Sequence, residues 1–560
     1  MKKYICFGLL AVLVISITIR LLPLFNYSIW GSDTGEYYEL TRRVVEKGAL
    51  SFDYKGWGFC YPYFPGMFSL VGSASLLLSS NLLTTLLIII PVISSLSVIL
   101  VFLITNEIFK DMNAGLISAL LLSVAIPHVF TTSHTMPGSL GDFLFILCML
   151  LFIKSYQSRN FLILFFVAVI ALVITHHLSS YFLMIALALF IFLRELSNTK
   201  TNFKELKFDL LAVSFLLLAN ITYWLYAAGP FREIIKDAFD LAIEILLLFG
   251  LVAFVIMVLL IKLRRKFLLR ERKIAIPSYR RILITYCSGL IVGFAVLFIS
   301  VFLKFPGTTI RIDKIAILLF SPSIIIFCLA VFGNAFAPFY RRAMLLFCWL
   351  LAVALSFFLG IATSNTVLIS YRHLQYLIVP LAIFAGFGAT KFIELSKRKK
   401  TATTFLACLL AFLIILAPFS CYPSKAVLGG FEEGTPLQNI NSIVWSKEYL
   451  ANEPVASDHR LSSMLFGFAN CRASWEFTPK IFHVSSFSDA KDELENAAIP
   501  SGKTRINYIV IDEVMKEGVC LKQWEPAIAM SDESLKKFEK EPFIKIYDDG
   551  FTQVYKIAWC

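Results

Sequence analysis

The stretch YICFGLLAVLVISITIRLLPL at residues 4–24, followed by WGSDTGEYY at residues 30–38, decides the fold of this chain. The first stretch is almost unbroken apolar sequence behind a dilysine start, and it is long enough to span a bilayer core of about 30 Å. No small-residue cleavage site follows it, so we expect an uncleaved membrane-spanning helix. The second stretch places two carboxylates, Asp33 and Glu36, where that helix must leave the membrane.

The composition of the whole chain agrees with a polytopic membrane protein. Of its 560 residues, 58% are hydrophobic and only 16% are charged, and many apolar runs approach or exceed 18 residues. The formal net charge of +13 sits in short loops between these runs, where it orients the chain in the membrane and does not indicate nucleic-acid binding. The eleven cysteines include no CxxC pair, which argues against a metal–thiolate site.

We predict thirteen membrane spans and an all-α membrane domain over residues 1–420. The segment 64–80 is also apolar, but it follows a proline-rich start and is rich in Ser and Gly, so we interpret it as an interfacial or re-entrant helix. The predicted spans are 4–24, 82–104, 114–130, 142–155, 160–175, 178–193, 209–228, 241–261, 282–303, 315–334, 343–361, 372–391 and 402–420.

The distribution of basic residues supports the count of thirteen. With the N-terminus in the cytoplasm, the inner loops and span ends hold 25 Lys and Arg, whereas the outer ones before residue 421 hold 10, as the positive-inside rule requires. Counting 64–80 as a span would place the basic loops 262–281 and 391–400 opposite the N-terminus. We therefore expect a multi-pass protein of the cell membrane, with a long first outer loop over residues 25–81.

The same parity places residues 421–560 outside the cytoplasm, and their composition is no longer that of a membrane segment. We predict a small extracytoplasmic α/β domain, in which Asp548-Asp549-Gly550 forms a hairpin turn. Its four cysteines allow a disulfide that sequence alone does not pair. The predicted elements are helices at 437–450 and 459–469, and strands at 454–457, 508–512, 543–547 and 551–557.

Asp33 and Glu36 are our candidates for catalytic residues. Ser32 or Asp33 could instead cap a helix that begins near residue 34, with Glu36 near its dipole. Acidic side chains at the outlet of a spanning helix are partly desolvated at an energetic cost, which favours a catalytic or metal-binding role in addition to capping. The aromatic side chains of the same loop suit stacking on sugar rings or anchoring at the membrane interface.

A further acidic residue, Asp142, opens the fourth predicted span after a polar loop. Either Ser139 or Asp142 could cap that helix. Alternatively, Asp142 and His134 join Asp33 around a hard divalent cation such as Mg²⁺ or Mn²⁺, which prefers oxygen ligands.

Positive charge is depleted in the outer loops of membrane proteins, so the basic residues found there need an explanation. Lys304, Arg311 and Lys314 share one outer loop, and Arg372 with His373 begins the twelfth span. They could bind lipid head groups without specificity. The sharper hypothesis is a donor-phosphate clamp, because arginine gives paired hydrogen bonds to phosphate oxygens. Carboxylates opposite such a clamp suit a lipid-phosphate donor, in which the acid activates an acceptor and the cations stabilise the leaving phosphate.

Three segments together resemble the GT-C superfamily, the polytopic glycosyltransferases that use polyprenyl-phosphate-linked sugars. They are Asp33 after the first span, YPYFP at residues 61–65 and YRHLQYLIVP at residues 371–380. Thirteen spans followed by an outer α/β domain look most like the catalytic subunits of oligosaccharyltransferases, particularly archaeal ones. The resemblance implies transfer of a sugar from polyprenyl (dolichyl) phosphate to a glycan, protein or lipid acceptor on the outer face, with Asp33 as general base or metal ligand.

The chain also departs from the oligosaccharyltransferase pattern. Where those enzymes carry the sequon-reading WWDYG motif, SDHR stands at residues 457–460. This departure favours a monosaccharide-transferring relative, similar to protein mannosyltransferases or lipid-A aminoarabinose transferases, and leaves protein N-glycosylation as the alternative. Rivals from other classes are a transporter or flippase and a non-catalytic glycan-assembly protein. A transporter predicts ionisable residues in discontinuous helices at mid-membrane, whereas here the polar residues crowd one face.

Overall fold

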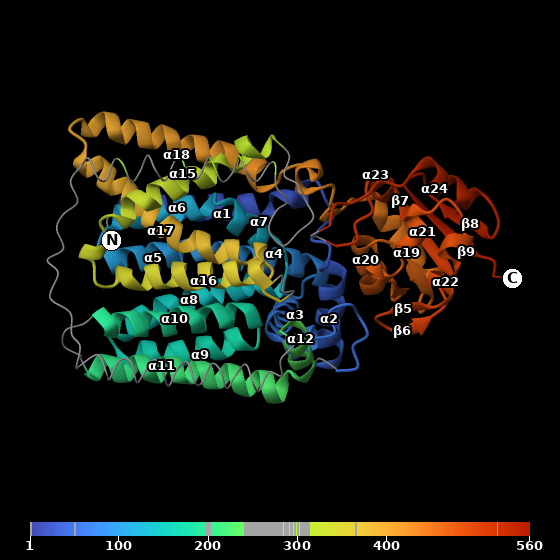
Figure 1. Cartoon of the computed structure of the whole chain (residues 1–560), viewed down its shortest axis with the longest axis horizontal. Coiled ribbons are helices and arrows are strands. Elements are labelled where there is room, and N and C mark those ends of the chain that lie inside the picture. The colour runs from blue at the N-terminus through green and yellow to red at the C-terminus, as the bar shows by residue number, and fades with distance from the viewer. Residues whose placement is uncertain are drawn as a thin grey trace.

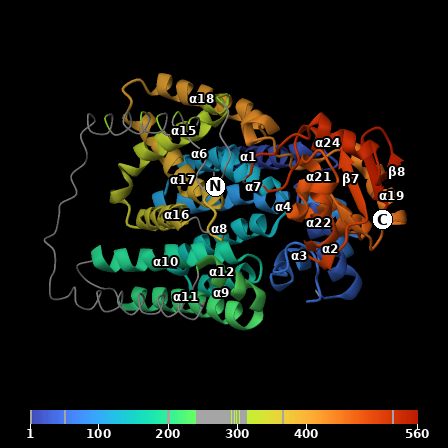
Figure 2. The same cartoon turned by 45° about the vertical axis from the view of Figure 1, so that its right-hand side comes forward.

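The computed structural model has a helical bundle with an α/β part at one end (Figure 1). The N-terminus lies at the opposite end of the bundle, and the rotated view shows the same division (Figure 2). The structure describes residues 3–49, 52–197, 203–239, 314–363, 367–522 and 525–559, with five single positions between 284 and 302.

Within these residues, nine helices are long and apolar enough to cross a membrane. A tenth crossing forms if α6 and α7, which are bent by 59° at a short break, count as one broken span. The chain is therefore a multi-pass membrane protein. The helices of the bundle are α1 (Lys3–Leu21), α4 (Leu82–Ser95), α5 (Ser97–Phe109), α6 (Met112–Ser123), α7 (Ile126–Ser133), α8 (Pro137–Ser155), α9 (Arg159–Val173), α10 (His177–Ser197), α11 (Phe203–Thr222), α15 (Ala316–Asn334), α16 (Ala343–Thr363), α17 (Tyr371–Leu395) and α18 (Lys399–Cys421).

Eleven of the thirteen predicted spans fall on described residues, and each of them contains a helix. Of the remaining two, 241–261 lies outside the described residues, and 282–303 is described at five single positions only. The segment predicted as an interfacial helix forms α3 (Gly66–Leu78), which is apolar but only 13 residues long, and this is too short to cross a bilayer core. It packs beside α2 (Thr34–Lys47), at the end of the bundle that carries the α/β part (Figure 1).

Large apolar side chains cover the outside of the bundle, as expected for a surface that faces lipid. Phe7, Leu77 and Ile415 are each more than 70% exposed. The inside of the bundle is also apolar, and α17 packs between α6, α15 and α16. Because hydrocarbon offers no hydrogen-bond partners, the helical backbone must satisfy its own polar groups in this region.

The C-terminal α/β part matches the sequence prediction closely. Two helices, α19 (Gln438–Tyr449) and α20 (His459–Ala469), were both expected. A five-stranded sheet has the order β4-β3-β7-β9-β8, in which β3 pairs in parallel with β4 and β7, and β9 pairs antiparallel with β7 and β8. Its strands are β3 (Pro454–Ala456), β4 (Arg472–Ala473), β7 (Tyr508–Asp512), β8 (Phe543–Asp548) and β9 (Thr552–Ile557).

The first loop is joined to the C-terminal part by backbone pairing and helix packing. β1 (Ile29–Trp30) pairs antiparallel with β2 (Gly434–Thr435), and α2 packs along α20. Cys421, Cys471 and Cys520 are buried as free thiols, so they form no disulfide with one another, while the fourth cysteine of this part, Cys560, lies outside the described residues.

Candidate active site

The candidate site is built around Asp33, the residue that precedes α2. Asp33 occupies the N-cap position of that helix, yet its side chain makes no capping hydrogen bond. Its Oδ1 atom instead accepts a hydrogen bond from Nε2 of His459 at 2.8 Å, and its Oδ2 atom accepts one from the Tyr37 hydroxyl at 3.4 Å. The Asp33 carboxylate therefore bonds side chains at the junction between the first loop and the C-terminal part, and it does not cap its own helix.

His459 reaches Asp33 from the first turn of α20, and its other ring nitrogen is also engaged. Nδ1 of His459 lies 3.0 Å from Oε2 of Glu476, which in turn accepts a hydrogen bond from Trp57 Nε1 at 2.7 Å. The Trp57 ring packs edge-on against the imidazole, with 5.1 Å between the ring centroids. One imidazole thus lies between two carboxylates, one from the first loop and one from the C-terminal part.

The charges of Asp33, His459 and Glu476 stabilise one another. Burial alone would lower the pKa of His459, but the hydrogen bonds and negative charges of Asp33 and Glu476 raise it to about 10. Burial alone would raise the pKa of Asp33, but the hydrogen bond and charge of His459, followed by the charge of Arg372, lower it. The same imidazolium lowers the pKa of Glu476 against the effect of burial. At neutral pH both carboxylates are therefore ionised and the imidazole is charged.

The neighbours of His459 along the chain are structural. Asp458 caps α20 by accepting a hydrogen bond from the backbone N–H of Leu461 at 2.8 Å, and Arg460 forms a fully buried ion pair with Asp512. Of the residues that stand in place of the WWDYG motif, His459 is therefore the one that contacts the first loop at Asp33.

Glu36, the second predicted catalytic residue, lies one turn beyond Asp33 and is enclosed. It is 1% exposed, and its Oε1 atom accepts hydrogen bonds from the Tyr54 hydroxyl and the Gly58 backbone N–H, both at 2.6 Å. Burial raises its pKa to about 7, although both hydrogen bonds oppose the shift. A Cβ at Gly58 would collide with the Tyr61 ring, so glycine lets the loop close over this carboxyl.

Two tyrosines connect Asp33 to the start of the α3 segment. The hydroxyls of Tyr37 and Tyr61 lie 3.2 Å apart, and their rings pack edge to face at 5.3 Å. Tyr61 begins η2 (Tyr61–Tyr63), the short helix formed by the predicted YPYFP motif. The structure thus brings two of the three segments that carry the family resemblance together.

Of the five predicted phosphate-binding residues, Arg372 is the one that the structure places at Asp33. It begins α17, with its guanidinium carbon 6.0 Å from the Tyr371 ring centroid, and its charge contributes to the lowered pKa of Asp33. It forms no ion pair with a carboxylate of the described residues. His373 is buried in the bundle, 2.9 Å from the Ser356 hydroxyl.

Of the other three predicted cations, the structure describes one. Lys314 is exposed just before α15, while Lys304 and Arg311 lie outside the described residues.

The three predicted metal ligands do not share a site. Asp142 is fully buried in the bundle, where its Oδ2 atom lies 2.8 Å from Nε2 of His128, which also bonds Arg20. His134 instead donates a hydrogen bond from Nδ1 to the Phe130 carbonyl at 2.7 Å. Asp33 pairs with His459.

In the described part of the chain, no group of three His, Cys, Asp or Glu side chains is arranged to hold a metal ion. The donor set proposed for Mg²⁺ or Mn²⁺ therefore does not fit the residues as they lie, and a bound divalent cation stays a prediction.

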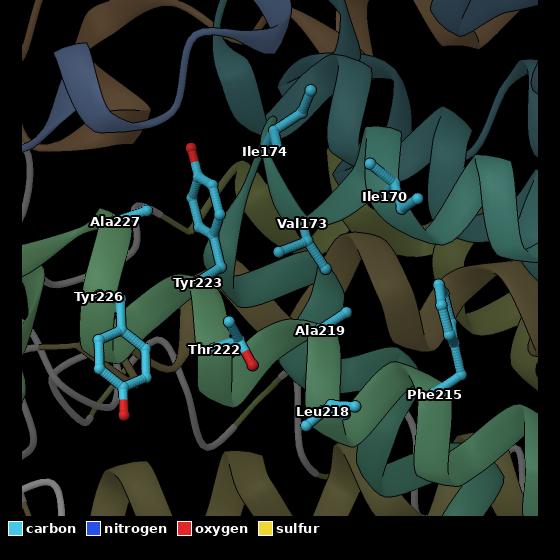
Figure 3. Close-up of a pocket in the computed structure, with 10 residues that line it drawn as sticks. All are labelled: Ile170, Val173, Ile174, Phe215, Leu218, Ala219, Thr222, Tyr223, Tyr226 and Ala227. Carbon is cyan, nitrogen blue, oxygen red and sulfur yellow. The ribbon is translucent and has the colours of Figure 1, made fainter.

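An apolar groove of about 470 Å³ lies between α9, α11 and η3 (Tyr223–Ala227), as Figure 3 shows. The Tyr223 hydroxyl donates a hydrogen bond to the Tyr63 carbonyl at 2.6 Å, so the groove adjoins the η2 segment that carries Tyr61. Its lining side chains are Ile170, Val173, Ile174, Phe215, Leu218, Ala219, Thr222, Tyr223, Tyr226 and Ala227.

Sequence reasoning missed His459 and Glu476 as members of this site. His459 carried a weak signal, because it replaces part of a motif at a predicted helix start, whereas Glu476 carried none. Trp57 belongs to the aromatic side chains of the first loop that were expected to stack on sugar rings or anchor at the interface, but its contact with Glu476 was not predicted.

No protein-family model and no curated protein matches the chain, but solved structures do. The archaeal oligosaccharyltransferase AglB from Archaeoglobus fulgidus, in complex with an inhibitory peptide and a dolichol-phosphate, matches with a TM-score of 0.62 and 15% identity. That match covers 100% of this chain and 75% of the other. This chain has the GT-C fold. An oligosaccharyltransferase of the same organism, tethered to an acceptor peptide with an NVT sequon, matches with a TM-score of 0.64 and 14% identity. That match covers 100% of this chain and 74% of the other.

A more distant GT-C structure, the arabinofuranosyltransferase AftD from Mycobacteria, matches at a TM-score of 0.50 and 13% identity. The match covers 100% of this chain but 40% of AftD. At such identities the similarity establishes the GT-C fold and not the reaction, so the function must be argued from the site.

Proposed function

We propose that the chain is an integral membrane glycosyltransferase that moves a sugar from a polyprenyl (dolichyl) phosphate donor to a glycan, protein or lipid acceptor. The observation that carries this proposal is an ionised, largely buried carboxylate, Asp33, that feels the charge of a guanidinium, Arg372, at one end of a GT-C bundle. A carboxylate that interacts electrostatically with a cation suits a reaction in which a proton leaves one reactant and negative charge develops on the other.

In the proposed step, a hydroxyl or amide of the acceptor attacks the anomeric carbon of the donor sugar. A new bond forms between the acceptor atom and that carbon, while the bond from the carbon to the phosphate oxygen breaks. The proton of the acceptor passes to Asp33, and the electron pair of the broken bond leaves with the polyprenyl phosphate. Arg372 would stabilise that phosphate with paired hydrogen bonds.

The groove between α9 and α11 offers a place for the hydrocarbon tail of such a donor. Its lining is almost entirely apolar, and Leu218 and Tyr226 in its wall are 64% and 84% exposed. The hydrogen bond from Tyr223 to Tyr63 connects the groove to η2, the segment that also carries Tyr61.

We further propose that the α/β part and the first loop lie on the extracytoplasmic side, and that the N-terminus lies in the cytoplasm. The excess of Lys and Arg in the predicted inner loops supports this orientation. Protein acceptors are the first to test, because the AglB structures contain an inhibitory peptide or an acceptor peptide.

The test is transfer by the purified full-length chain in proteoliposomes supplied with radiolabelled sugars on dolichyl or undecaprenyl phosphate. The expected result is label in an acceptor that wild type produces and Asp33→Asn does not. Movement of labelled donor between leaflets without transfer would identify a flippase, and saturable donor binding without transfer or movement would identify a non-catalytic assembly protein. Either result contradicts the proposal.

A further inference from the structure

The imidazole of His459 lies directly between the carboxylates of Asp33 and Glu476. Its Nε2 atom lies 2.8 Å from Asp33 Oδ1 and its Nδ1 atom lies 3.0 Å from Glu476 Oε2. Ionised carboxylates only accept hydrogen bonds, and a neutral imidazole carries one N–H. Two carboxylate partners, one at each ring nitrogen, therefore require both N–H groups, and an imidazolium with both nitrogens protonated has no lone pair left to bind a metal.

The remaining oxygen of Asp33 is also engaged, since Oδ2 accepts the hydrogen bond of the Tyr37 hydroxyl. Glu476 is fixed in the same way, with Trp57 Nε1 on one carboxylate oxygen and His459 on the other. The carboxylates at this junction are therefore satisfied by donors of the chain itself. This is a different arrangement from an open set of oxygen ligands, which a hard divalent cation requires.

The scaffold holds His459 firmly in this position. The Asp458 cap fixes the first turn of α20, and α20 packs on α2 so closely that a Cβ at Gly35 or Gly467 would collide with the backbone of the other helix. The His459 side chain is 9% exposed and that of Asp33 is 25% exposed. A contact enclosed to this degree is screened little by solvent.

We propose that His459 is a positioning residue that takes the place of a divalent cation at Asp33, so that sugar transfer by this chain needs no divalent metal. The inference rests on the proposed glycosyltransferase function and concerns the same site. The C-terminal part supplies a fixed positive charge that balances Asp33 and orients its carboxylate, and Glu476 holds that charge in place.

The first experiment compares wild-type transfer in excess EDTA with transfer in Mg²⁺ or Mn²⁺. The expected rates agree within about twofold. Loss of transfer on chelation, restored by either cation, would overturn the proposal. His459→Gln should lower kcat about 100-fold with little change in KM for the donor, because glutamine keeps a hydrogen bond and loses the charge. Unchanged kcat in this variant would also overturn it.

The second experiment measures Mn²⁺ binding to the full-length chain by the loss of the free-ion signal in electron paramagnetic resonance. Wild type should bind no Mn²⁺ at this junction. His459→Ala exposes two uncompensated carboxylates and should gain a site, which the added change Asp33→Asn should remove. A wild-type site that Asp33→Asn abolishes would overturn the inference.

The two proposals can fail separately. If wild type transfers no sugar under any condition, the proposed function fails, and the Mn²⁺ measurement still decides whether His459 excludes a cation from Asp33. His483→Gln is a matched control, because His483 lies in the same C-terminal part, in α21 (Lys480–His483), away from the first loop. It should leave transfer, EDTA resistance and Mn²⁺ binding unchanged.

Discussion

Gly467, in the last turn of α20, packs directly against the backbone of Gly35 in the first turn of α2, and this contact sets how closely the two helices approach. A Cβ on Gly467 would overlap the Gly35 carbonyl, and a Cβ on Gly35 would overlap the carbonyl of Ser463. Asp33 and His459 stand at the starts of these helices. Their 2.8 Å hydrogen bond, formed between residues 426 positions apart, thus depends on two residues that carry no side chain.

The change Gly467→Ala should separate the two helices. Overpacking typically costs about 1–3 kcal/mol, which exceeds the roughly 1 kcal/mol of helix propensity that alanine gains. We expect a lower Tm in detergent and at least about a tenfold loss of sugar transfer. Gly229→Ala is the matched control, because no atom of the described residues lies within 4 Å of a Cβ at that position, and equal transfer in both variants would show that the contact is unimportant.

Asp33→Asn should abolish most of the activity without unfolding the chain. The Asp33 side chain makes no capping bond to α2, so asparagine removes the charge and little local structure. Turnover should fall about 100-fold or more, measured as label transferred per minute at saturating donor. Glu46→Gln, which weakens an exposed ion pair with Arg42 on the same helix, should transfer normally. Wild-type turnover in Asp33→Asn would remove this carboxylate from the reaction.

The elements of the C-terminal part were predictable because their signals are local. The strand at 508–512 is a β-branched run, and both this strand and the helix at 459–469 were located to the residue. The Asp33 carboxylate was also found from its neighbours, since an acidic residue that follows a spanning helix is unusual. Its partners His459 and Glu476 were not, because only the tertiary fold brings them to it.

The surroundings of Asp142 could not be read from its neighbours in the sequence. Its position at the start of a predicted span indicated a helix cap or a ligand for a divalent cation. The 59° bend between α6 and α7 instead carries His128 beside Asp142 inside the bundle, and no period in the sequence signals a bend of this kind. His128 bonds only the Oδ2 atom of Asp142, and the Oδ1 atom has no hydrogen-bond partner among the described residues, so a metal-binding role of Asp142 stays a prediction.

The orientation of the chain can be tested with single cysteines in a background where the exposed Cys6 and Cys408 are replaced by serine. In sealed right-side-out vesicles, Lys503→Cys in the C-terminal part should react with a membrane-impermeant maleimide. Lys397→Cys, between α17 and α18, should react only after permeabilisation, because basic loops stay in the cytoplasm. Both residues are exposed, and the reverse pattern would invert the proposed orientation.

Arg372 should not tolerate lysine if it grips the donor phosphate. A lysine keeps the charge but lacks the planar fork that gives paired hydrogen bonds. Arg372→Lys should therefore raise the KM for donor about tenfold or more and lower turnover, whereas Arg42→Lys, whose partner Glu39 lies on the same helix, should change neither. Donor titrations decide the question. Wild-type behaviour in Arg372→Lys together with loss in Arg372→Ala would leave only an anchor among lipid head groups.

The buried Glu36 predicts how stability changes with pH. Its pKa is about 7 in the folded chain, against a usual value of 4.5. The folded state therefore binds this proton more tightly than the unfolded state. The contribution of the group to stability is full below pH 4.5 and is lost as the pH rises through 7. A shift of this size corresponds to a loss of up to about 3 kcal/mol at pH 8.

Glu36→Gln isolates this effect, because the glutamine amide stays neutral and its oxygen still accepts the bonds from Tyr54 and Gly58. The variant should match wild type in Tm at pH 5 and exceed it at pH 8, with the difference growing between those values. Glu448→Gln, an exposed carboxylate of α19, should follow the wild-type profile. A Tm difference that is the same at pH 5 and pH 8 would show that Glu36 does not titrate in this range.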